Sequence, residues 1–301
     1  MRLSVAYSSA HAHALIIALT LTLCSLMNTA SAQFVEGFMQ NASYWHDGKS
    51  EIDFYNAEFV RDGQPHQCEV LLTLTPGFVD PTTLAPLDNP KPPGSLPVIR
   101  MNESATLPRG IFAEQRSISI LWRLDFTSLA RISAVGTDGL GNFAKSIYET
   151  REANQISWCY SCDTYRGTVN GQEIASPNRP IVFYDELPLR VRTIDFSKAA
   201  GEFDAQLAPT LVASSKEFGE FKPAKFSWKT GERAIEVSLR HEGGMDRFVL
   251  DRDFPFLLRE WSAADGSRWK LKNSLKAEYW NYGKNGDRER ALRDPMLRHP
   301  D

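Results

Sequence analysis

Residues 234–254, AIEVSLRHEGGMDRFVLDRDF, decide the fold class of this chain. Apolar and polar residues alternate before the central glycine pair, which places Ile235, Val237 and Leu239 on one side of an extended backbone. The pair Gly243-Gly244 then reverses the chain into a second run rich in strand-forming residues. This pattern predicts a β-hairpin.

The neighbouring sequence predicts more strands of the same kind. Residues 256–261 are followed by the turn Ala264-Asp265-Gly266-Ser267 and by a long strand over 268–280. Near the start, Asp62-Gly63 lies between two runs rich in β-branched and aromatic residues. The predicted strands are 50–60, 67–75, 117–126, 130–135, 142–149, 234–239, 245–254, 256–261 and 268–280.

One helix is predicted, over residues 185–196. Asp185 can cap its first turn, and Leu187, Val191 and Ile194 follow at helical spacing. Pro188 is tolerated there, because the backbone N–H groups of a first turn have no partner within the helix. The alternative is a further strand over 189–196. The predicted fold is mainly β: a curved antiparallel sheet or partly open β-barrel with one short helix.

The first 32 residues have the composition of a secretory signal peptide. Arg2 precedes the apolar run 14–27, which is too short to span a bilayer comfortably, and Ala30-Ser31-Ala32 forms a small-residue cleavage site. We therefore expect export to the periplasm or outer envelope, with cleavage after Ala32. Residues 33–301 then form a single β-rich domain, with a Pro-rich excursion at 76–95.

Composition and charge exclude several classes of protein. The chain is 42% hydrophobic and 24% charged, which is typical of a globular protein. Its net charge of −3 becomes about −4 without the signal segment, and no basic block occurs, so we expect no nucleic-acid partner. No apolar run after residue 32 reaches the ~20 residues of a transmembrane helix.

Three cysteines, Cys68, Cys159 and Cys162, follow the expected cleavage site. The sequence Trp158-Cys159-Tyr160-Ser161-Cys162 is similar to the dithiol motif of thioredoxin-like enzymes, but turn-forming residues follow it where such an enzyme has a long helix. A structural disulfide between Cys159 and Cys162 is the favoured interpretation, with Cys68 buried or a competing partner.

No motif of high specificity indicates catalysis, a cofactor or a metal. The chain lacks GxSxG, HExxH, P-loop and GxGxxG sequences. The acidic groups Asp185-Glu186 and Asp251-Arg252-Asp253 are expected in solvated turns or caps rather than in an acid/base site. His46, Asp47, His66 and Cys68 match no zinc spacing. We therefore predict no catalytic residue, no cofactor and no metal site.

Two aromatic pairs lie at the ends of the predicted sheet, Tyr44-Trp45 before the first strand and Tyr279-Trp280 at the close of the last. We expect the first and last predicted strands, 50–60 and 268–280, to lie close together. The pairs either seal the ends of the core, because Trp and Tyr bury large areas while keeping a polar atom, or line a ligand site at the mouth of a barrel.

The two ends of the sequence resemble a family of exported bacterial β-rich proteins of unknown function. Residues 44–52, YWHDGKSEI, and 270–281, KLKNSLKAEYWN, are similar to its opening Tyr-Trp, Gly-Lys-Ala-Glu pattern and to its closing Tyr-Trp-Asn strand. Ser50 and Asp62 replace the usual Ala and Tyr. Some members carry the label "septum formation inhibitor Maf", a name of cytosolic nucleotide pyrophosphatases, which an exported strand-rich chain does not resemble.

Residues 184–196, YDELPLRVRTIDF, followed by an all-β end, also resemble periplasmic half-barrel proteins related to lipoprotein carriers. The resemblances imply a non-catalytic envelope protein that binds an apolar or lipid-like ligand or another envelope component. The alternative is an exported enzyme, either a hydrolase or, through the WCYSC motif, a thiol oxidoreductase.

Overall fold

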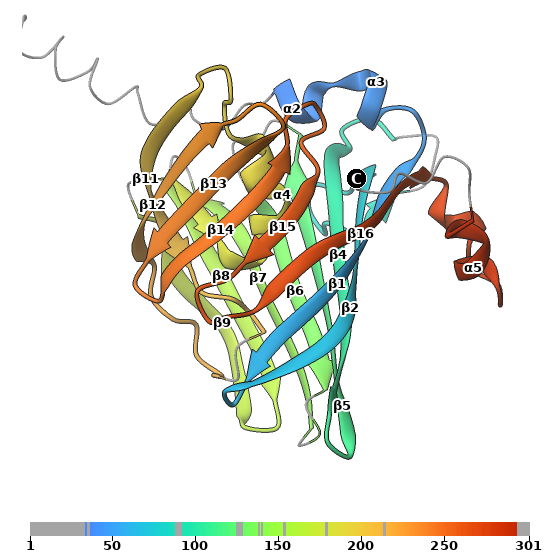
Figure 1. Ribbon diagram of the computed structural model, residues 1–301. Helices are drawn as coiled ribbons and strands as arrows, with labels where there is room; N and C mark the ends of the chain where they lie inside the picture. The colour runs from blue at the N-terminus through green and yellow to red at the C-terminus, as the bar shows by residue number, and fades with distance from the viewer. Residues whose placement is uncertain are drawn as a thin grey trace, which may run out of the picture.

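The computed structural model describes residues 34, 37–87, 92–124, 129–137, 139, 141–152, 155–177, 180–212 and 215–293. Within these ranges the chain is mainly β, and sixteen strands form one large open sheet (Figure 1). The expected signal peptide lies outside the described residues. The strands are β1 (Ser50–Arg61), β2 (Gln64–Val79), β3 (Pro86–Leu87), β4 (Leu96–Arg109), β5 (Phe112–Arg123), β6 (Leu129–Thr137), β7 (Asn142–Glu152), β8 (Gln155–Thr164), β9 (Gly167–Ala175), β10 (Ile181–Phe183), β11 (Ala200–Ala208), β12 (Lys222–Thr230), β13 (Ala234–His241), β14 (Gly244–Asp251), β15 (Leu258–Ser262) and β16 (Arg268–Ala277).

The order of strands places the first and last strands, β1 and β16, in the middle of the sheet. From β1 the strands continue outward through β2 and β4 to β9 at one edge, whereas β10 to β16 start at the other edge and return to β1. β1 pairs antiparallel with β16, with Ser50 opposite Ala277. The prediction that the first and last long strands lie side by side is confirmed.

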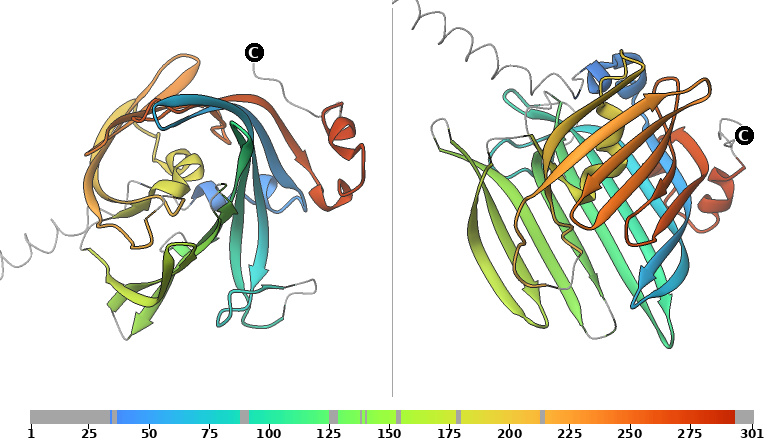
Figure 2. Two further views of the ribbon diagram at one scale, coloured as in Figure 1. Left: turned by 90° about the horizontal axis from the view of Figure 1, so that it is seen from below. Right: turned by 60° about the vertical axis from the view of Figure 1, so that its left-hand side comes forward.

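The sheet curls so that its two edges approach each other. Viewed along its axis it forms a C-shaped half-barrel (Figure 2). Trp158 of β8 packs edge-on against Phe183 of β10, with ring centroids 4.9 Å apart. Because the two edges are close together, residues 176–180 are enough to connect β9 at one edge of the sheet to β10 at the other.

A broken helix lies on the concave face of the sheet (Figures 1 and 2). It consists of η1 (Tyr184–Glu186), α4 (Leu187–Arg190) and η2 (Val191–Thr193), so the helix predicted over 185–196 is present as three short turns. Leu187, Leu189 and Val191 are completely buried. The apolar side chains that gave the helical pattern thus pack into the core.

The segment between β11 and β12 fills the space between the edges of the curled sheet. Lys145 of β7 donates a hydrogen bond to the backbone oxygen of Ser215 at 2.7 Å, and Tyr160 of β8 donates to that of Lys216 at 3.1 Å. Phe218 packs against Tyr160 with ring centroids 5.4 Å apart. The described parts of 209–221 thus tie β11 and β12 to the opposite wall.

The convex face is covered locally by a short C-terminal helix, α5 (Asp287–Ala291). Ile52 and Phe54 of β1 point to this side and form a small cluster with Leu275 and Ala291. The alternate residues of β1 point to the concave face, as the period of a strand requires. The remaining short helices are α2 (Gly37–Gln40), α3 (Ala42–Trp45) and η3 (Tyr279–Asn281).

The predicted hairpin turns are confirmed. β1 and β2 are joined by Asp62 and Gly63, whose φ angles are 51° and 73°. Two successive positive φ angles define the tight turn that matches the twist of a hairpin, and Asp-Gly is a preferred sequence for it. The turn between β15 and β16 contains Gly266, with a φ of 90°.

The Pro-rich excursion at 76–95 is shorter than expected. β2 continues through Pro76 to Val79 and pairs with β4 as far as Leu96, and the short strand β3, which follows β2 in the chain, pairs back with its end. The strands that were not predicted are β3, β4, β8, β9, β10, β11 and β12.

Candidate functional site

A cleft of about 500 Å³ opens at the end of the half-barrel where α2 lies. We call it the end cleft. Residues after η2, the end of β12, the start of β13 and the loop between β14 and β15 form its wall. Most of the lining is apolar, and its large side chains are Phe38, Ile194, Phe196, Ile235, Phe254 and Phe256.

The four phenylalanines of the end cleft contact one another in a chain. Phe38 and Phe254 have ring centroids 5.4 Å apart, Phe254 and Phe256 are 6.0 Å apart, and Phe256 and Phe196 are 5.3 Å apart. These separations are those of favourable aromatic pairs. The rings form a continuous apolar wall in which Phe196, Phe254 and Phe256 are half-buried, whereas Phe38, Ile194 and Ile235 are buried.

The loop between β14 and β15 presents two of these rings from a strained backbone. Phe256 has a φ of 54°, a left-handed conformation that costs energy in a bulky residue. Its backbone N–H donates to the oxygen of Asp253 at 2.8 Å. Arg192 donates to the oxygen of Pro255 from Nε at 3.1 Å and from Nη2 at 3.0 Å. These hydrogen bonds hold the loop in the shape that exposes Phe254 and Phe256 to the cleft.

A buried ion pair supports the floor of the end cleft. Arg192 is fully buried and binds both carboxylate oxygens of Glu51, at 2.6 and 3.0 Å. Burial alone would raise the pKa of Glu51, but the charge and hydrogen bonds of Arg192 outweigh it and lower that pKa. The Tyr44 hydroxyl also donates to Glu51, at 2.5 Å. Glu51 is therefore an ionised group in the core.

Asp53 is the next residue of β1 on the same face, and its pKa is shifted in the opposite direction to that of Glu51. It is fully buried, and neither of its carboxylate oxygens has a hydrogen-bond partner among the described residues. Burial and the charge of Glu51 raise the pKa of Asp53 well above its usual value. The pKa values of the two carboxyl groups are thus shifted in opposite directions, that of Glu51 down and that of Asp53 up.

The structure brings only part of the predicted aromatic site near the end cleft. Tyr44 packs against Phe254, with centroids 5.3 Å apart, and the Trp45 indole donates to the backbone oxygen of Phe38 at 2.9 Å. Both lie behind the cleft wall rather than in its lining. Tyr279 and Trp280 contact each other and are 40% and 55% exposed, outside the cleft.

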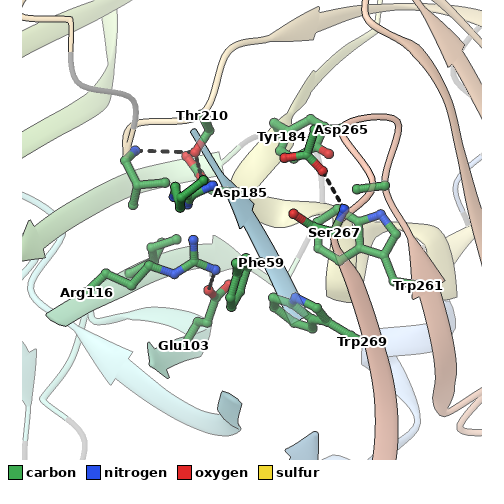
Figure 3. A pocket seen from close by; sticks show the side chains of 14 residues that line it. Phe59, Glu103, Arg116, Tyr184, Asp185, Thr210, Trp261, Asp265, Ser267 and Trp269 are labelled. Carbon is green, nitrogen blue, oxygen red and sulfur yellow. Dashed lines mark hydrogen bonds and ion pairs between the residues drawn. The ribbon is translucent and has the colours of Figure 1, made fainter. Parts of the chain in front are cut away.

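A second, smaller cavity of about 100 Å³ lies inside the half-barrel (Figure 3). We call it the interior cavity. One side is aromatic: Trp261 and Trp269 have centroids 5.0 Å apart, and Tyr184 and Trp261 are 5.6 Å apart. Phe59 continues this wall, 6.0 Å from Trp269. None of the four aromatic residues predicted from the sequence lines this cavity.

Buried Asp246 fixes two of these rings. Its Oδ2 accepts a hydrogen bond from the Tyr184 hydroxyl at 2.8 Å and another from the Trp261 indole at 3.3 Å. Its Oδ1 accepts from the backbone N–H of Ala264 at 2.8 Å. Burial raises the pKa of Tyr184, and the charge of Asp246 adds to the effect, so the phenol stays protonated and keeps donating.

The opposite side of the interior cavity is charged. Arg116 donates to Glu103 at 2.9 Å, and both side chains are buried (Figure 3). Asp185 accepts from the Thr210 hydroxyl at 2.5 Å and from the backbone N–H of Leu211 at 2.7 Å. Burial raises the pKa of both Glu103 and Asp185.

The expected disulfide between Cys159 and Cys162 is not formed. Both are free thiols, as is Cys68. Cys159 and Cys162 lie three positions apart on β8, opposite Tyr148 and Lys145 of β7. Side chains with odd spacing on a strand point to opposite faces, and three residues span about 10 Å, beyond the Cα separation that a disulfide permits.

The other polar groups considered in the sequence do not gather into a site. Within the described ranges, no group of three or more His, Cys, Asp or Glu side chains could hold a metal ion. Asp185 and Glu186 are both buried rather than solvated, a correction to the sequence interpretation. Glu186 accepts from the Trp122 indole at 2.7 Å, so its role is to satisfy a buried donor. No described helix is long and apolar enough to cross a membrane.

Comparisons with known proteins supply a fold neighbour and no family. No protein-family model matches the chain, and no curated protein gives a significant match. Among solved structures, the chain is similar to a beta-barrel-like protein of domain of unknown function DUF1849 from Brucella abortus. The two are 9% identical with a TM-score of 0.46, covering 75% of this chain and 96% of that one. The sequence resemblances at the two ends stay predictions.

One sequence signal could have located the buried charges. Glu51 and Asp53 have the same parity along β1 as Tyr55, Ala57 and Phe59, which point to the core. Charged residues in phase with core residues indicate a buried polar cluster. Their partner Arg192 is 141 positions away, and no local pattern connects them.

Proposed function

We propose that this chain is an exported, non-catalytic binding protein of the bacterial envelope, and that the end cleft binds the apolar part of a lipid-like ligand. The observation that carries the proposal is the continuous wall of four phenylalanines in a cleft of about 500 Å³. Binding sites for small ligands have volumes of roughly 300 to 1,000 Å³, mostly apolar linings and few polar groups.

Three features of the end cleft support an amphiphilic ligand. Arg252 lines it as an exposed cation at the rim. Asp195, half-buried in the same lining, adds a carboxyl group for the polar part of such a ligand. The strained loop at Phe256 adds a feature that is common at binding sites.

A substitution that narrows the end cleft tests whether the cleft binds an apolar ligand. Ser197 lines the cleft and is exposed, whereas the neighbouring Lys198 is exposed and does not line it. In Ser197→Trp, we expect the affinity for the neutral fluorescent probe N-phenyl-1-naphthylamine to fall about tenfold, ~1.4 kcal/mol. Lys198→Trp adds the same side chain outside the cleft and should bind as the wild type does. Equal affinity of both variants, or no saturable binding by the wild type, would contradict the proposal.

The natural ligand is tested on protein purified from its own envelope. Native mass spectrometry followed by lipid extraction should find an amphiphile bound to the wild type and depleted from Ser197→Trp. The same sample tests export: the chain should begin at Gln33. A retained Met1 would contradict export without affecting the cleft, and an empty protein that hydrolyses a screened substrate would favour an enzyme.

A further inference from the structure

The interior cavity is separate from the end cleft, and its chemistry differs from that of a lipid site. Trp261, Trp269 and Tyr184 form one side, Asp185, Glu103 and Arg116 form the other, and Phe59 lies between them against Arg116 (Figure 3). The volume of about 100 Å³ is too small for an acyl chain. An engineered protein cavity of about 150 Å³ admits benzene, so this one suits a compact group of about five heavy atoms.

The charges around the cavity favour a positive ligand. Arg116 is the one cation on the buried wall, and its charge is already compensated by Glu103. Arg61, nearer the surface, lies 3.8 Å from Glu114. By contrast, Asp185 on the buried wall and Asp265 at the exposed rim form no ion pair within the described part of the chain, although the charges of Arg116 and Lys145 act on Asp185. With Glu103, they make three carboxyl groups against the two cations Arg61 and Arg116 in the lining.

The hydrogen bonds of Asp185 indicate the kind of cation. Its two oxygens already accept from Thr210 and from the N–H of Leu211, so it offers charge rather than open acceptor sites. A quaternary ammonium group has no N–H to donate and is bound by carboxylate charge and by ring faces. Trp261, Trp269 and Tyr184 supply the rings, and Asp246 fixes two of them.

The charge of Arg116 is already shared between a ring and a carboxylate. Its guanidinium carbon lies 3.8 Å from the centroid of the Phe59 ring, and its Nη2 donates to Glu103 at 2.9 Å. Arg116 is therefore compensated from two sides, which leaves Trp261, Trp269, Tyr184 and Asp185 in the lining for a ligand.

We propose that the interior cavity is a binding site for a small quaternary ammonium group. The site goes beyond the lipid-like ligand of the end cleft and does not depend on it. The rings of Trp261, Trp269 and Tyr184 and the carboxylate of Asp185 would hold the cation. A neutral ligand of the same shape would forgo the attraction of the carboxylates and of the rings.

Two probes of matched shape test the proposal with the mature wild-type protein. Choline is the cation, and 3,3-dimethylbutan-1-ol is its neutral isostere. Calorimetric titration should show that choline binds at least about tenfold more tightly. Equal affinity, or no saturable binding of choline, would overturn the proposal. Probe binding in the end cleft is measured separately, so either proposal can fail alone.

Variants then test the assigned charge. Asp185→Asn should weaken choline binding about tenfold and leave the neutral alcohol within about twofold. Asp204→Asn removes a carboxylate from the exposed side of β11 and should leave both unchanged. If Asp185→Asn fails to fold, Asp265→Asn at the exposed rim is the substitute, with an expected loss of about twofold to threefold because solvent screens its charge. Unchanged choline binding in a folded variant would contradict the assignment.

Discussion

Arg192 connects three separate parts of the chain through one side chain, and its partner Glu51 adds a fourth. It lies in η2, binds the carboxylate of Glu51 in β1, and donates to Pro255 in the loop that shapes the end cleft. Tyr44 of α3 donates to the same carboxylate. Desolvating two charges costs several kcal/mol each, and only a well-aligned pair with further hydrogen bonds offsets that cost. This pair has such bonds, so its contribution depends on both partners being present.

Replacing Arg192 by Met should lower the free energy of unfolding by about 3 to 5 kcal/mol at pH 7, because the Glu51 carboxylate stays buried without its cation. The wild-type pKa of Glu51 is lowered, so the pair stabilises above the unfolded pKa and loses its effect as pH falls through the folded pKa. In the variant, Glu51 can protonate and remove the penalty. Urea titrations should therefore show a smaller difference at pH 4.5 than at pH 7.

The matched control for Arg192→Met is Lys225→Met. Lys225 pairs with Glu202 at 2.9 Å, but both side chains are exposed. Solvent screening makes such surface pairs weak, so this variant should unfold at the wild-type urea concentration. An Arg192→Met variant as stable as the control at pH 7 would show that the buried pair contributes nothing.

Strand β8 shows how an element's geometry overrides a motif. Trp158, Tyr160 and Cys162 point to the core and are buried, whereas Cys159 is half-buried on the other face. The dithiol spacing of the sequence is thus produced by a strand, where it separates the thiols rather than joining them. Burial raises the pKa of Cys68, on β2, to about 11, so its reactive thiolate is scarce at neutral pH.

Mature protein unfolded without reductant should therefore titrate three thiols per chain with Ellman's reagent. The folded protein should react more slowly, because Cys162 is in the core. The double variant Cys159→Ser, Cys162→Ala should keep its stability in both oxidising and reducing buffer, whereas loss of a disulfide would cost roughly 2 to 5 kcal/mol. One thiol per unfolded chain would mean that the bridge does form.

The elements that could be predicted from the sequence are those with strict local signals. Turn sequences such as Asp62-Gly63 predicted the hairpins, and the spacing of apolar residues in 185–196 predicted the helix. β9, GTVNGQEIA, was missed because most of its side chains are exposed, so it has no apolar alternation. β4 was missed because Pro97 and Pro108 near its ends resemble loop signals.

The candidate sites were less predictable than the elements for a physical reason. Both cavities are assembled from segments far apart in the chain, such as Phe38 with Phe256 and Glu103 with Asp185. Only the curl of the sheet brings them together. Tyr44 and Trp45 lie near the end cleft because they precede the first strand. Their position next to that strand is a local signal, so it could be predicted from the sequence.

At the scale of the whole molecule, the sheet is curled but open, and its edges are β9 and β10. An exposed edge invites pairing with another chain, and natural proteins reduce that risk with bulges and polar edge residues. β9 has both: its pairing with β8 is irregular between Tyr160 and Cys162, and it carries Gly171 with a φ of 65°. The described parts of 209–221 bridge the space between the edges through contacts with β7 and β8.

This architecture predicts a gradient of local stability across the sheet. β1 pairs with β2 on one side and β16 on the other, and its side chains are largely buried. β9 pairs only with β8 within the described residues, and its side chains are largely exposed. Amides that open locally with little loss of buried surface exchange first. Hydrogen exchange followed by mass spectrometry should therefore protect peptides of β1 most and those of β9 least.

The exchange experiment also distinguishes an open half-barrel from a closed assembly. If β9 were paired across the gap with β10, or with β9 of a second chain, its amides would gain partners and exchange as slowly as those of β1. Repeating the measurement over a hundredfold range of protein concentration separates these cases, because only pairing between chains depends on concentration. Fast exchange in β9 at every concentration is the result expected for the open sheet. The interior of such a sheet is covered by side chains rather than by a continuous ring of strands.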